Sequence, residues 1–328
     1  MKVLLCGFGR MGESHGLFYS VHPLVQVVGV VDPNPHRLAR AAMLFPNAQL
    51  ASSIEMATVE ADTADICSPP IYHASQVRHF LLRGVNVLCE KPAILNPETG
   101  VKLSRLARSM RRTLHPIHNY LYSPAFGIMR DFVARGDLGH VVSVTVDVFR
   151  TGSARGVSDW RPNWREDPEL SGGGVLVDHG SHWIYVLLHL LGTPSRIRCT
   201  LDSCDPVDRE AHLSLEFEPL AHAHINLSWV SNVRANSLTV NMEGGWIRLV
   251  DGVVNIQTSS GSREFAISND DSHAHMAWFS PLFRDYELLC KGDPGPTIEW
   301  ENAVTVARVL QLSIESHDYG GVWLAYAQ

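Results

Sequence analysis

The first 120 residues alternate between short, almost continuous apolar runs and longer stretches in which apolar residues recur at helical spacing. The apolar runs cover residues 3–6, 25–31, 64–67, 85–89 and 114–117, and the stretches between them cover 11–20, 35–44, 73–83 and 97–110. Strands that are apolar throughout are buried on both faces, and helices between successive strands place those strands in parallel. The pattern therefore predicts a parallel-sheet α/β domain over residues 1–120.

A different pattern begins near residue 121. Helices are expected at 124–135, 174–191, 276–290 and about 300–316, and strand-like runs at 141–149, 196–201, 212–217, 223–230, 237–242, 246–250 and 253–257. In several runs apolar and polar residues alternate, as Ile225, Leu227 and Trp229 do with their neighbours, which is typical of an antiparallel sheet with one covered face. Residues 121–328 are therefore predicted to form an α+β domain with an open, mainly antiparallel sheet. We expect its last helix to pack back on the first domain.

The first apolar run leads directly into a G-x-G-x-x-G pattern. Its six residues are Gly7, Phe8, Gly9, Arg10, Met11 and Gly12. The first glycine permits a tight turn, the second lets the backbone approach a pyrophosphate, and the third lets helix and strand pack closely. The free N–H groups at the start of the following helix can then bind phosphate oxygens. The pattern predicts that this turn binds a dinucleotide.

An acidic residue follows the glycines at the expected distance. Asp32 comes directly after the second apolar run, about 20 residues beyond Gly12. A carboxylate at this position hydrogen-bonds the ribose 2′-OH of NAD and repels the 2′-phosphate of NADP. Arg37 is a nearby cation that we consider as a phosphate contact. The sequence therefore favours NAD as the cofactor over NADP.

Several later motifs resemble those of the Gfo/Idh/MocA oxidoreductases. The motifs are Cys67-Ser68-Pro69-Pro70 with His73, Glu90-Lys91-Pro92, Asn119 with Pro124, Trp164-Arg165, and the glycine-rich run from Ser171 to His182 that contains Asp178 and His179. They occur in the family's order over nearly the whole chain. By this resemblance the chain is identified as a member of the family, which implies a Rossmann domain followed by an α/β domain whose open sheet often makes the oligomer interface.

The resemblance also implies a role for each of these residues. Lys91, Asp178 and His182 correspond to the family's catalytic set, and the Lys91–Pro92 bond is expected to be cis. Besides the glycine turn, Asp32 and Arg37, cofactor contacts are implied for Ser68, Pro69, Pro70, His73, Glu90, Lys91 and Asn119. Substrate contacts are implied for Lys91, Tyr120, Trp164, Arg165, Asp178, His179 and His182. The chain has Leu121 where the family often has Arg, and Tyr185 where it often has Asp, so the substrate stays open.

The three catalytic candidates suit hydride transfer. When a hydride leaves an alcohol carbon, a proton must leave the oxygen, and histidine, with a reference pKa of about 6.5, is a suitable base. Asp178 and His182 are four residues apart, which places both on one face of a helix. Lys91 adds a positive charge that stabilises a developing alkoxide. We expect NAD-dependent oxidation of a secondary alcohol or reduction of a ketone, and the resemblance implies a sugar, cyclitol or amino-sugar substrate.

Three other functions fit the same residues. One is imine or enone reduction on the same scaffold, and another is a catalytically silent NAD(P)-binding sensor. The third is hydrolysis or elimination through a closed redox cycle of NAD, which gives no net NADH. The presence of Lys91, Asp178 and His182 argues against the sensor. The stereochemistry and the physiological direction of the reaction stay open.

Composition excludes several classes of partner. Lys and Arg total 27 against 34 Asp and Glu, so the net charge is −7, and a chain without basic runs is a poor match for nucleic acid. The sequence lacks an apolar run long enough to span a membrane. Six cysteines without a C-x-x-C pair indicate reduced thiols, a cytoplasmic location and no bound metal. Because the helices suffice for only one face of the second sheet, we expect a homodimer or homotetramer.

Overall fold

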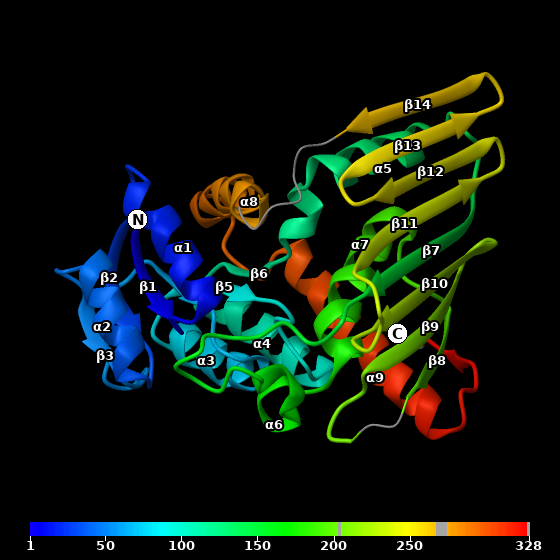
Figure 1. Ribbon diagram of the computed structural model, residues 1–328. Coiled ribbons are helices and arrows are strands. Elements are labelled where there is room, and N and C mark those ends of the chain that lie inside the picture. The colour runs from blue at the N-terminus through cyan, green and yellow to red at the C-terminus, as the bar shows by residue number, and fades with distance from the viewer. Residues whose placement is uncertain (203–204, 267–273, 327–328) are drawn as a thin grey trace. The chain divides into compact units, whose positions relative to one another are not determined.

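The structure, a computed structural model, describes residues 1–202, 205–266 and 274–326 (Figure 1). The described chain divides into two compact units. Unit 1 comprises Met1–His118, Ala154–Gly172 and Phe279–Val304, and unit 2 comprises Asn119–Ser153, Gly173–Trp278 and Thr305–Gln328. The chain first passes from unit 1 to unit 2 after His118, and two later segments also belong to unit 1.

Unit 1 is built on a parallel sheet. Within the described residues, six strands run in the order β3-β2-β1-β4-β5-β6, and each neighbouring pair is parallel. The strands are β1 (Lys2–Cys6), β2 (Gln26–Val31), β3 (Gln49–Ala51), β4 (Thr63–Ile66), β5 (Asn86–Glu90) and β6 (Leu114–Ile117). The helices along this part of the chain are α1 (Arg10–Val21), α2 (Pro35–Leu44), α3 (Pro70–Leu82) and α4 (Pro97–Met110). The predicted parallel α/β arrangement is confirmed, although the short β3 was not predicted.

The central strand of this sheet positions the glycine turn. Val3, Leu4, Leu5 and Cys6 are almost completely buried, as expected for a strand with helices over both faces. β1 lies between β2 and β4, so the chain order of the strands reverses beside it. The carboxyl end of β1 is therefore a topological switch point, the place where open α/β sheets bind ligands.

Parts of two later helices also belong to unit 1. In α8 (Ala274–Lys291), the ring of Phe279 lies edge-on to Phe18 of α1, with the ring centroids 5.2 Å apart. In α9 (Ile298–Asp318), the Trp300 indole N–H donates to the carbonyl oxygen of Gly100 in α4, at 3.4 Å. These contacts attach the first turns of α9 and most of α8 to the helices of the parallel sheet.

Unit 2 is built on a mixed sheet. In the part of the chain that is described, nine strands run in the order β14-β13-β12-β11-β7-β10-β9-β8-β15. They are β7 (Val141–Phe149), β8 (Arg196–Leu201), β9 (Glu210–Phe217), β10 (Ala221–Ser228), β11 (Ala235–Met242), β12 (Gly245–Val250), β13 (Val253–Thr258), β14 (Gly261–Ala266) and β15 (Leu324–Ala325). β10 is parallel to β7, and the other pairs are antiparallel. The predicted open, mainly antiparallel sheet is confirmed, with β14 and β15 as unpredicted edge strands.

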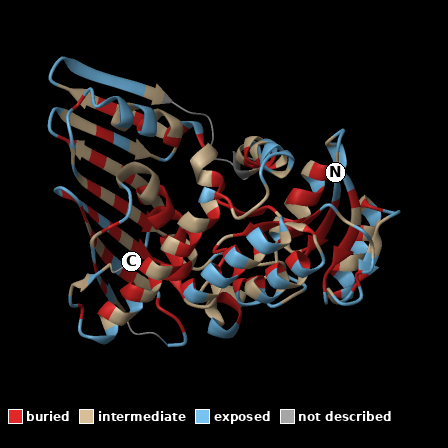
Figure 2. Cartoon of the chain, turned by 180° about the vertical axis from the view of Figure 1, so that it is seen from behind, coloured by how far each residue is buried: buried red, intermediate tan, exposed pale blue. Residues whose placement is uncertain are grey.

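The two faces of this sheet differ in polarity. Buried and exposed positions alternate along its strands (Figure 2). The apolar face is covered, since η3 (Leu176–Gly180) contacts β10 and α5 (Pro124–Arg135) contacts β13. Ile225, Leu227 and Trp229 are almost completely buried and so lie on this covered face. The exposed side of β10 carries polar residues such as His222 and His224.

The remaining elements are short or close to the candidate site. They are η1 (Asn119–Tyr122), η2 (Trp164–Glu166), α6 (Pro168–Ser171) and α7 (Ser181–Leu191). The single helix predicted over 174–191 is instead a π-helical turn, η3, that continues into α7. Across the described ranges, none of the helices is long and apolar enough to cross a membrane.

Candidate active site

The glycine turn has the geometry that a dinucleotide requires. Gly7 adopts φ +91°, and a Cβ there would lie 2.7 Å from the backbone nitrogen of Ser68. A Cβ on Gly12 would lie 2.0 Å from the carbonyl oxygen of Gly7, so only glycine permits this close packing of helix and strand. A Cβ on Gly9 would have none of the described atoms beyond its chain neighbours within 4 Å. The backbone at Gly9, at the start of α1, is therefore open to a pyrophosphate.

Asp32 is fixed beside this turn. One carboxylate oxygen accepts a hydrogen bond from the backbone N–H of Phe8 at 2.7 Å, and the other accepts from the N–H of Asn34 at 2.8 Å. The residue is only 8% exposed. Burial raises the pKa of Asp32, while the two N–H donors and Arg37 oppose that rise. The carboxylate is thus held at the carboxyl end of β2, where it can accept hydrogen bonds from ribose hydroxyls.

Arg37, considered above as a phosphate contact, is bonded within the protein. Its Nε donates to the carbonyl oxygen of Phe8 at 2.7 Å, and its Nη2 donates to Glu13 at 2.5 Å. Glu13 also accepts from Nε of Arg40 at 2.7 Å. Arg37 therefore ties α2 to the glycine turn and to α1. The other turn candidates, Arg10 and Met11, begin α1, with Arg10 exposed.

The loops after β4 and β5 are joined by a buried histidine. The ring nitrogens of His73 lie 2.7 Å from the carbonyl oxygen of Ser68 and 2.9 Å from that of Pro92. Burial lowers the pKa of His73, and a neutral ring donates to only one of the two carbonyls at a time. His73 is completely buried, so its position supports a role in holding these loops together. Pro69 and Pro70 begin α3 in the same loop.

The segment that carries Lys91 is held by its own neighbour. The Lys91–Pro92 bond is cis, as the family resemblance implied. The Glu90 carboxylate accepts a hydrogen bond from the backbone N–H of Lys91 at 3.0 Å. Burial raises the pKa of Glu90, and the positive charges of His15 and Lys91 oppose the rise. Glu90 thus lies behind Lys91 as a mostly buried carboxylate.

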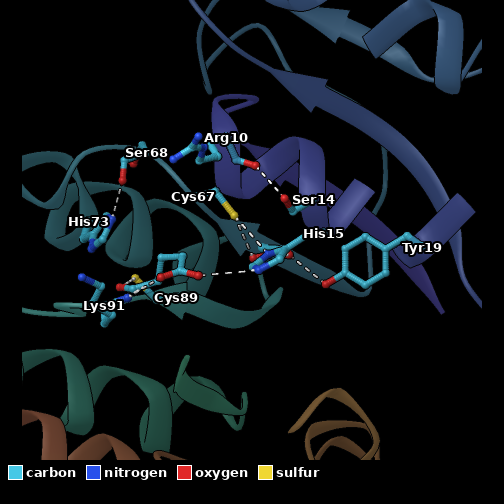
Figure 3. Close-up of polar contacts among 11 residues, drawn as sticks. Arg10, Ser14, His15, Tyr19, Cys67, Ser68, His73, Cys89 and Lys91 are labelled. Carbon is cyan, nitrogen blue, oxygen red and sulfur yellow. Dashed lines mark hydrogen bonds and ion pairs between the residues drawn. The ribbon is translucent and has the colours of Figure 1, made fainter. Parts of the chain in front are cut away.

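Within unit 1, Glu90 is one end of a buried cluster of polar side chains (Figure 3). The Nε2 atom of His15 lies 3.6 Å from Glu90, and Nδ1 lies 2.9 Å from Asp65. Asp65 also accepts a hydrogen bond from the Tyr19 hydroxyl at 2.8 Å, and the Cys67 thiol lies 3.3 Å from His15 Nδ1. Burial alone would lower the pKa of His15, but the Asp65 and Glu90 carboxylates outweigh it and raise the pKa.

The same cluster contains ligand types that bind metals, which sequence spacing did not reveal. His15, Asp65 and Cys67 each offer a ligand atom, and these atoms lie within 4.8 Å of one another. Their direct hydrogen bonds account for the arrangement without a metal ion. The absence of a bound metal therefore stays a prediction. Among the described cysteines, Cys6, Cys67, Cys89, Cys199 and Cys290 are not joined in disulfides, and Cys204 lies outside the described residues.

In unit 2, the candidate base packs against an aromatic ring. His182 is the second residue of α7 and is 9% exposed. Its imidazole stacks on the ring of Tyr120 in η1, with centroids 4.2 Å apart and planes 13° apart. Asp178 lies in the π-turn one turn earlier, and its carboxylate is 3.9 Å from Nε2 of His179. Unit 2 thus brings together Tyr120, Asp178, His179 and His182.

Two residues that sequence reasoning missed support this group. The buried Asp208 carboxylate accepts hydrogen bonds from the backbone N–H groups of Gly174 (2.9 Å) and Leu176 (2.7 Å), and so anchors the start of the π-turn. Arg150, just after β7, donates to the carbonyl oxygens of Phe149 and Ala235. Burial lowers the pKa of Arg150, and nearby negative groups that include Asp178 oppose this effect. In the sequence, the only sign of a role for Arg150 is its charge directly after a predicted strand.

The other predicted site residues lie in separate places. Trp164 and Arg165 form η2 in unit 1, where the Arg165 guanidinium lies 4.4 Å from the centre of the Trp164 ring. Asn119, buried, is the first residue of η1 in unit 2. Lys91 belongs to unit 1, whereas Asp178 and His182 belong to unit 2. The structure therefore describes the catalytic candidates as two separate groups.

Comparison with known proteins identifies the class to which this fold and these groups belong. The model described as "Oxidoreductase family, NAD-binding Rossmann fold" matches residues 1–118. The model described as "GFO/IDH/MocA C-terminal domain" matches residues 126–248. The chain belongs to the Gfo/Idh/MocA oxidoreductase family. Its N-terminal part is an NAD-binding Rossmann domain.

Curated relatives match over part of their length. D-glucoside 3-dehydrogenase of Escherichia coli (strain K12) is 26% identical over 200 residues, which are 60% of this chain and 55% of that protein. Levoglucosan dehydrogenase of Pseudarthrobacter phenanthrenivorans is 25% identical over 217 residues, which are 63% of this chain and 55% of that protein. The chain spans about half the length of the curated relatives it matches.

Solved structures share the whole fold. A levoglucosan dehydrogenase in complex with NADH and levoglucosan superposes with a TM-score of 0.87 at 19% identity, covering 100% of both chains. GenD2 from gentamicin A biosynthesis, in complex with NAD, superposes with a TM-score of 0.85 at 20% identity, covering 100% of this chain and 97% of that one. At such low identity this likeness shows the fold.

Proposed function

We propose that this protein is an NAD-dependent dehydrogenase that oxidises a secondary hydroxyl of a sugar, cyclitol or amino-sugar, or reduces the corresponding ketone. The observation that carries the proposal is the His182 group, in which a mostly buried imidazole is stacked on Tyr120 one turn from the carboxylate of Asp178. Unit 1 of the same chain supplies the dinucleotide turn and a lysine held by Glu90. Family membership supports the combination.

Each residue has a chemical task in this proposal. Gly7, Gly9 and Asp32 would hold NAD, which would supply the hydride acceptor for an alcohol carbon and, in its reduced form, the hydride donor for a ketone. His182 takes the hydroxyl proton as a general base, and Asp178 orients the imidazole or accepts a hydrogen bond from a substrate hydroxyl. The Lys91 ammonium stabilises the negative charge that develops on the oxygen. Tyr120, Trp164, Arg165 and His179 are proposed as substrate contacts, and Ser68, Pro69, Pro70 and Asn119 as cofactor contacts.

The names of relatives support the substrate class. They act, by name, on D-glucosides, levoglucosan, D-xylose and scyllo-inositol, all of which are polyhydroxylated. We therefore propose a small polyhydroxylated substrate, and neither nucleic acid nor membrane lipid.

A coupled assay tests the proposal. Purified protein is incubated with NAD⁺ and a panel of glycosides, anhydrosugars, free sugars and cyclitols, and NADH absorbance is followed while mass spectrometry identifies products. We expect net NADH and a keto product from at least one compound. Turnover restricted to imines or enones with NADH would contradict the proposal, as would product formation without net NADH. NAD⁺ binding without turnover of any panel member would favour the sensor.

We further propose that the protein is a homodimer or homotetramer in the cytoplasm. The exposed face of the unit 2 sheet presents hydrogen-bonding side chains in register, since Asn226 bonds both His212 and Asp147 across neighbouring strands. A flat polar sheet face can form a wet interface with a second copy. The free thiols of the described cysteines fit a reducing compartment. A monomer of 36.3 kDa by light scattering at micromolar concentration would contradict the oligomer.

A further inference from the structure

A loop from the middle of the chain lies against the Asp32 turn. Residues 154–165 belong to unit 1, although they come between strands of unit 2 in the sequence. The loop is closed by a hydrogen bond from the Gly156 N–H to the carbonyl oxygen of Pro162 at 2.7 Å. Near its tip, the carbonyl oxygen of Asp159 accepts a hydrogen bond from the Asn34 side-chain amide at 2.9 Å. Asn34 also donates its backbone N–H to Asp32. Asn34 therefore connects the backbone of Asp159 to the carboxylate proposed to bind the ribose.

The side chain of Asp159 faces the cation that a phosphate would need. Its carboxylate lies 3.9 Å from Nη1 of Arg37, and it keeps 33% of its surface exposed. The remaining polar groups of Arg37 are already bonded to Phe8 and Glu13. The Arg37 guanidinium thus has Phe8, Glu13 and Asp159 as its partners. The Asp159 carboxylate remains partly exposed to solvent at the edge of the turn.

Three carboxylates and three guanidinium groups lie on the segments around this turn. Glu13 pairs with Arg37 and Arg40, Asp159 lies 3.9 Å from Arg37, and Arg10 is exposed at the start of α1. The field of Asp159 reaches Asp32, because it adds to the effect of burial in raising the pKa of that carboxyl. A 2′-phosphate would bring a further charge of about −1.5 to −2 into this region. Beside Asp32 it would meet the partly exposed carboxylate of Asp159 and an arginine that is already bonded.

We propose that Asp159 is a second determinant of cofactor choice, which disfavours NADP by adding its charge to that of Asp32 and by facing the Arg37 nitrogen that Phe8 and Glu13 do not bond. NAD, with a neutral 2′-OH, is not penalised in this way. The inference rests on the NAD-binding part of the proposed function and is independent of which sugar is oxidised.

The test is the substitution Asp159→Asn, with binding of NAD⁺ and NADP⁺ to the full-length protein measured by titration calorimetry. The amide has the same shape, and the backbone carbonyl that bonds Asn34 is unchanged. We expect NADP⁺ to bind about tenfold more tightly than to the wild type, the order of effect of one charge beside a partly exposed phosphate. NAD⁺ affinity should stay within about twofold, because the removed charge does not face a charged group of NAD.

Glu169→Gln is the matched control. Glu169 is exposed in α6 of the same segment, and its substitution changes the net charge equally. It should leave both affinities unchanged, and the gain for NADP⁺ in Asp159→Asn should shrink at high salt, since screening weakens exposed charges. An unchanged NADP⁺ affinity in Asp159→Asn, or an equal gain in Glu169→Gln, would overturn the inference. Failure of NAD⁺ to bind the wild type would instead contradict the proposed function.

Discussion

The imidazole of His182 and the ring of Tyr120 are stacked face to face, 4.2 Å apart at their centroids and 13° from parallel. Trp183 and Trp278 approach the same tyrosine ring edge-on, with centroids 5.8 Å and 5.7 Å away. The stack restricts rotation of the imidazole about its side-chain bonds. A general base that is fixed before substrate binds loses less entropy in the reaction, so we expect Tyr120 to position His182 in the proposed mechanism.

Tyr120→Phe and Tyr120→Ala separate the ring from its hydroxyl. Tyr120→Phe keeps the stack, and we expect kcat to fall less than about threefold if the ring alone matters. Tyr120→Ala removes the stack and should lower kcat about tenfold or more, because the base is then misplaced. Steady-state kinetics on the identified substrate measures both. Equal, large losses in the two variants would show that the hydroxyl, through substrate or proton contact, is the important group.

His182→Ala and Lys91→Ala should impair chemistry without impairing cofactor binding. Loss of a general base typically costs about 10²–10⁴-fold in rate. Loss of a charge on the developing alkoxide costs about 10²–10³-fold by analogy with an oxyanion donor. NAD⁺ affinity should persist because the glycine turn is intact, and the double variant should lose less than the product of the single losses.

His189→Ala is the matched control for this experiment, since His189 lies in the same helix α7. It should retain most of the wild-type rate. Retention of activity within about threefold in His182→Ala would show that this histidine is structural.

Asp32→Ala should weaken NAD⁺ binding and relax the preference over NADP⁺. In this proposal the Asp32 carboxylate accepts hydrogen bonds from the ribose hydroxyls. It also accepts hydrogen bonds from the backbone N–H groups of Phe8 and Asn34, and the substitution removes their acceptor. Titration of the wild type and the variant with both cofactors measures the change. Tighter binding of NADP⁺ than NAD⁺ by the wild type would contradict the assignment.

Asp208→Asn should loosen the turn that carries Asp178. An amide can accept only one of the two hydrogen bonds from Gly174 and Leu176, so we expect a loss of about 1–3 kcal/mol in the free energy of unfolding. Activity should fall as well, about tenfold, because the π-turn also positions the start of α7.

Asp202→Ala provides the comparison. Asp202 lies in the same β8–β9 connection as Asp208 and accepts from the backbone N–H groups of Arg209 and Glu210 through one carboxylate oxygen, so it does not bond the π-turn. Its substitution should lower stability with little effect on kcat. Chemical denaturation and kinetics on both variants make the distinction, and equal effects on kcat would argue against a positioning role for Asp208.

His115 should make the protein sensitive to acid. Burial lowers the pKa of this histidine to about 4, while its Nδ1 lies 3.0 Å from the Thr297 hydroxyl. Because the folded pKa lies below the unfolded value of about 6.5, the unfolded chain takes up the proton first and stability is lost as pH falls from about 6.5 toward 4. From pH 7 to pH 5 the free energy of unfolding should fall in both proteins. The fall should be about 2 kcal/mol smaller in His115→Gln than in the wild type, because the variant lacks this titrating group. An identical pH dependence in the two proteins would contradict a neutral, buried His115.

The amino-acid sequence determined the elements whose signals are local. The order of parallel strands and helices in unit 1 follows from runs of consecutive apolar residues, and the helices Pro35–Leu44 and Pro97–Met110 have the predicted bounds because proline follows an asparagine cap at each start. The glycine turn and Asp32 were also predictable, since a short segment contains the whole pattern. Three-residue β3 and the edge strands β14 and β15 are too short or too exposed to show a clear period.

Only the tertiary structure decided which distant residues meet. His15, Asp65 and Glu90 come from one helix and two strands, and their contact depends on how β1, β4 and β5 pair beneath α1. Asp159 reaches Asn34 across a long sequence separation through a loop that has no regular period. Such contacts are made by chain packing, whereas hydrophobic period and glycine spacing report only neighbours along the chain. For the same reason the sequence did not reveal that Arg37, considered as a phosphate contact, is bonded to Phe8 and Glu13.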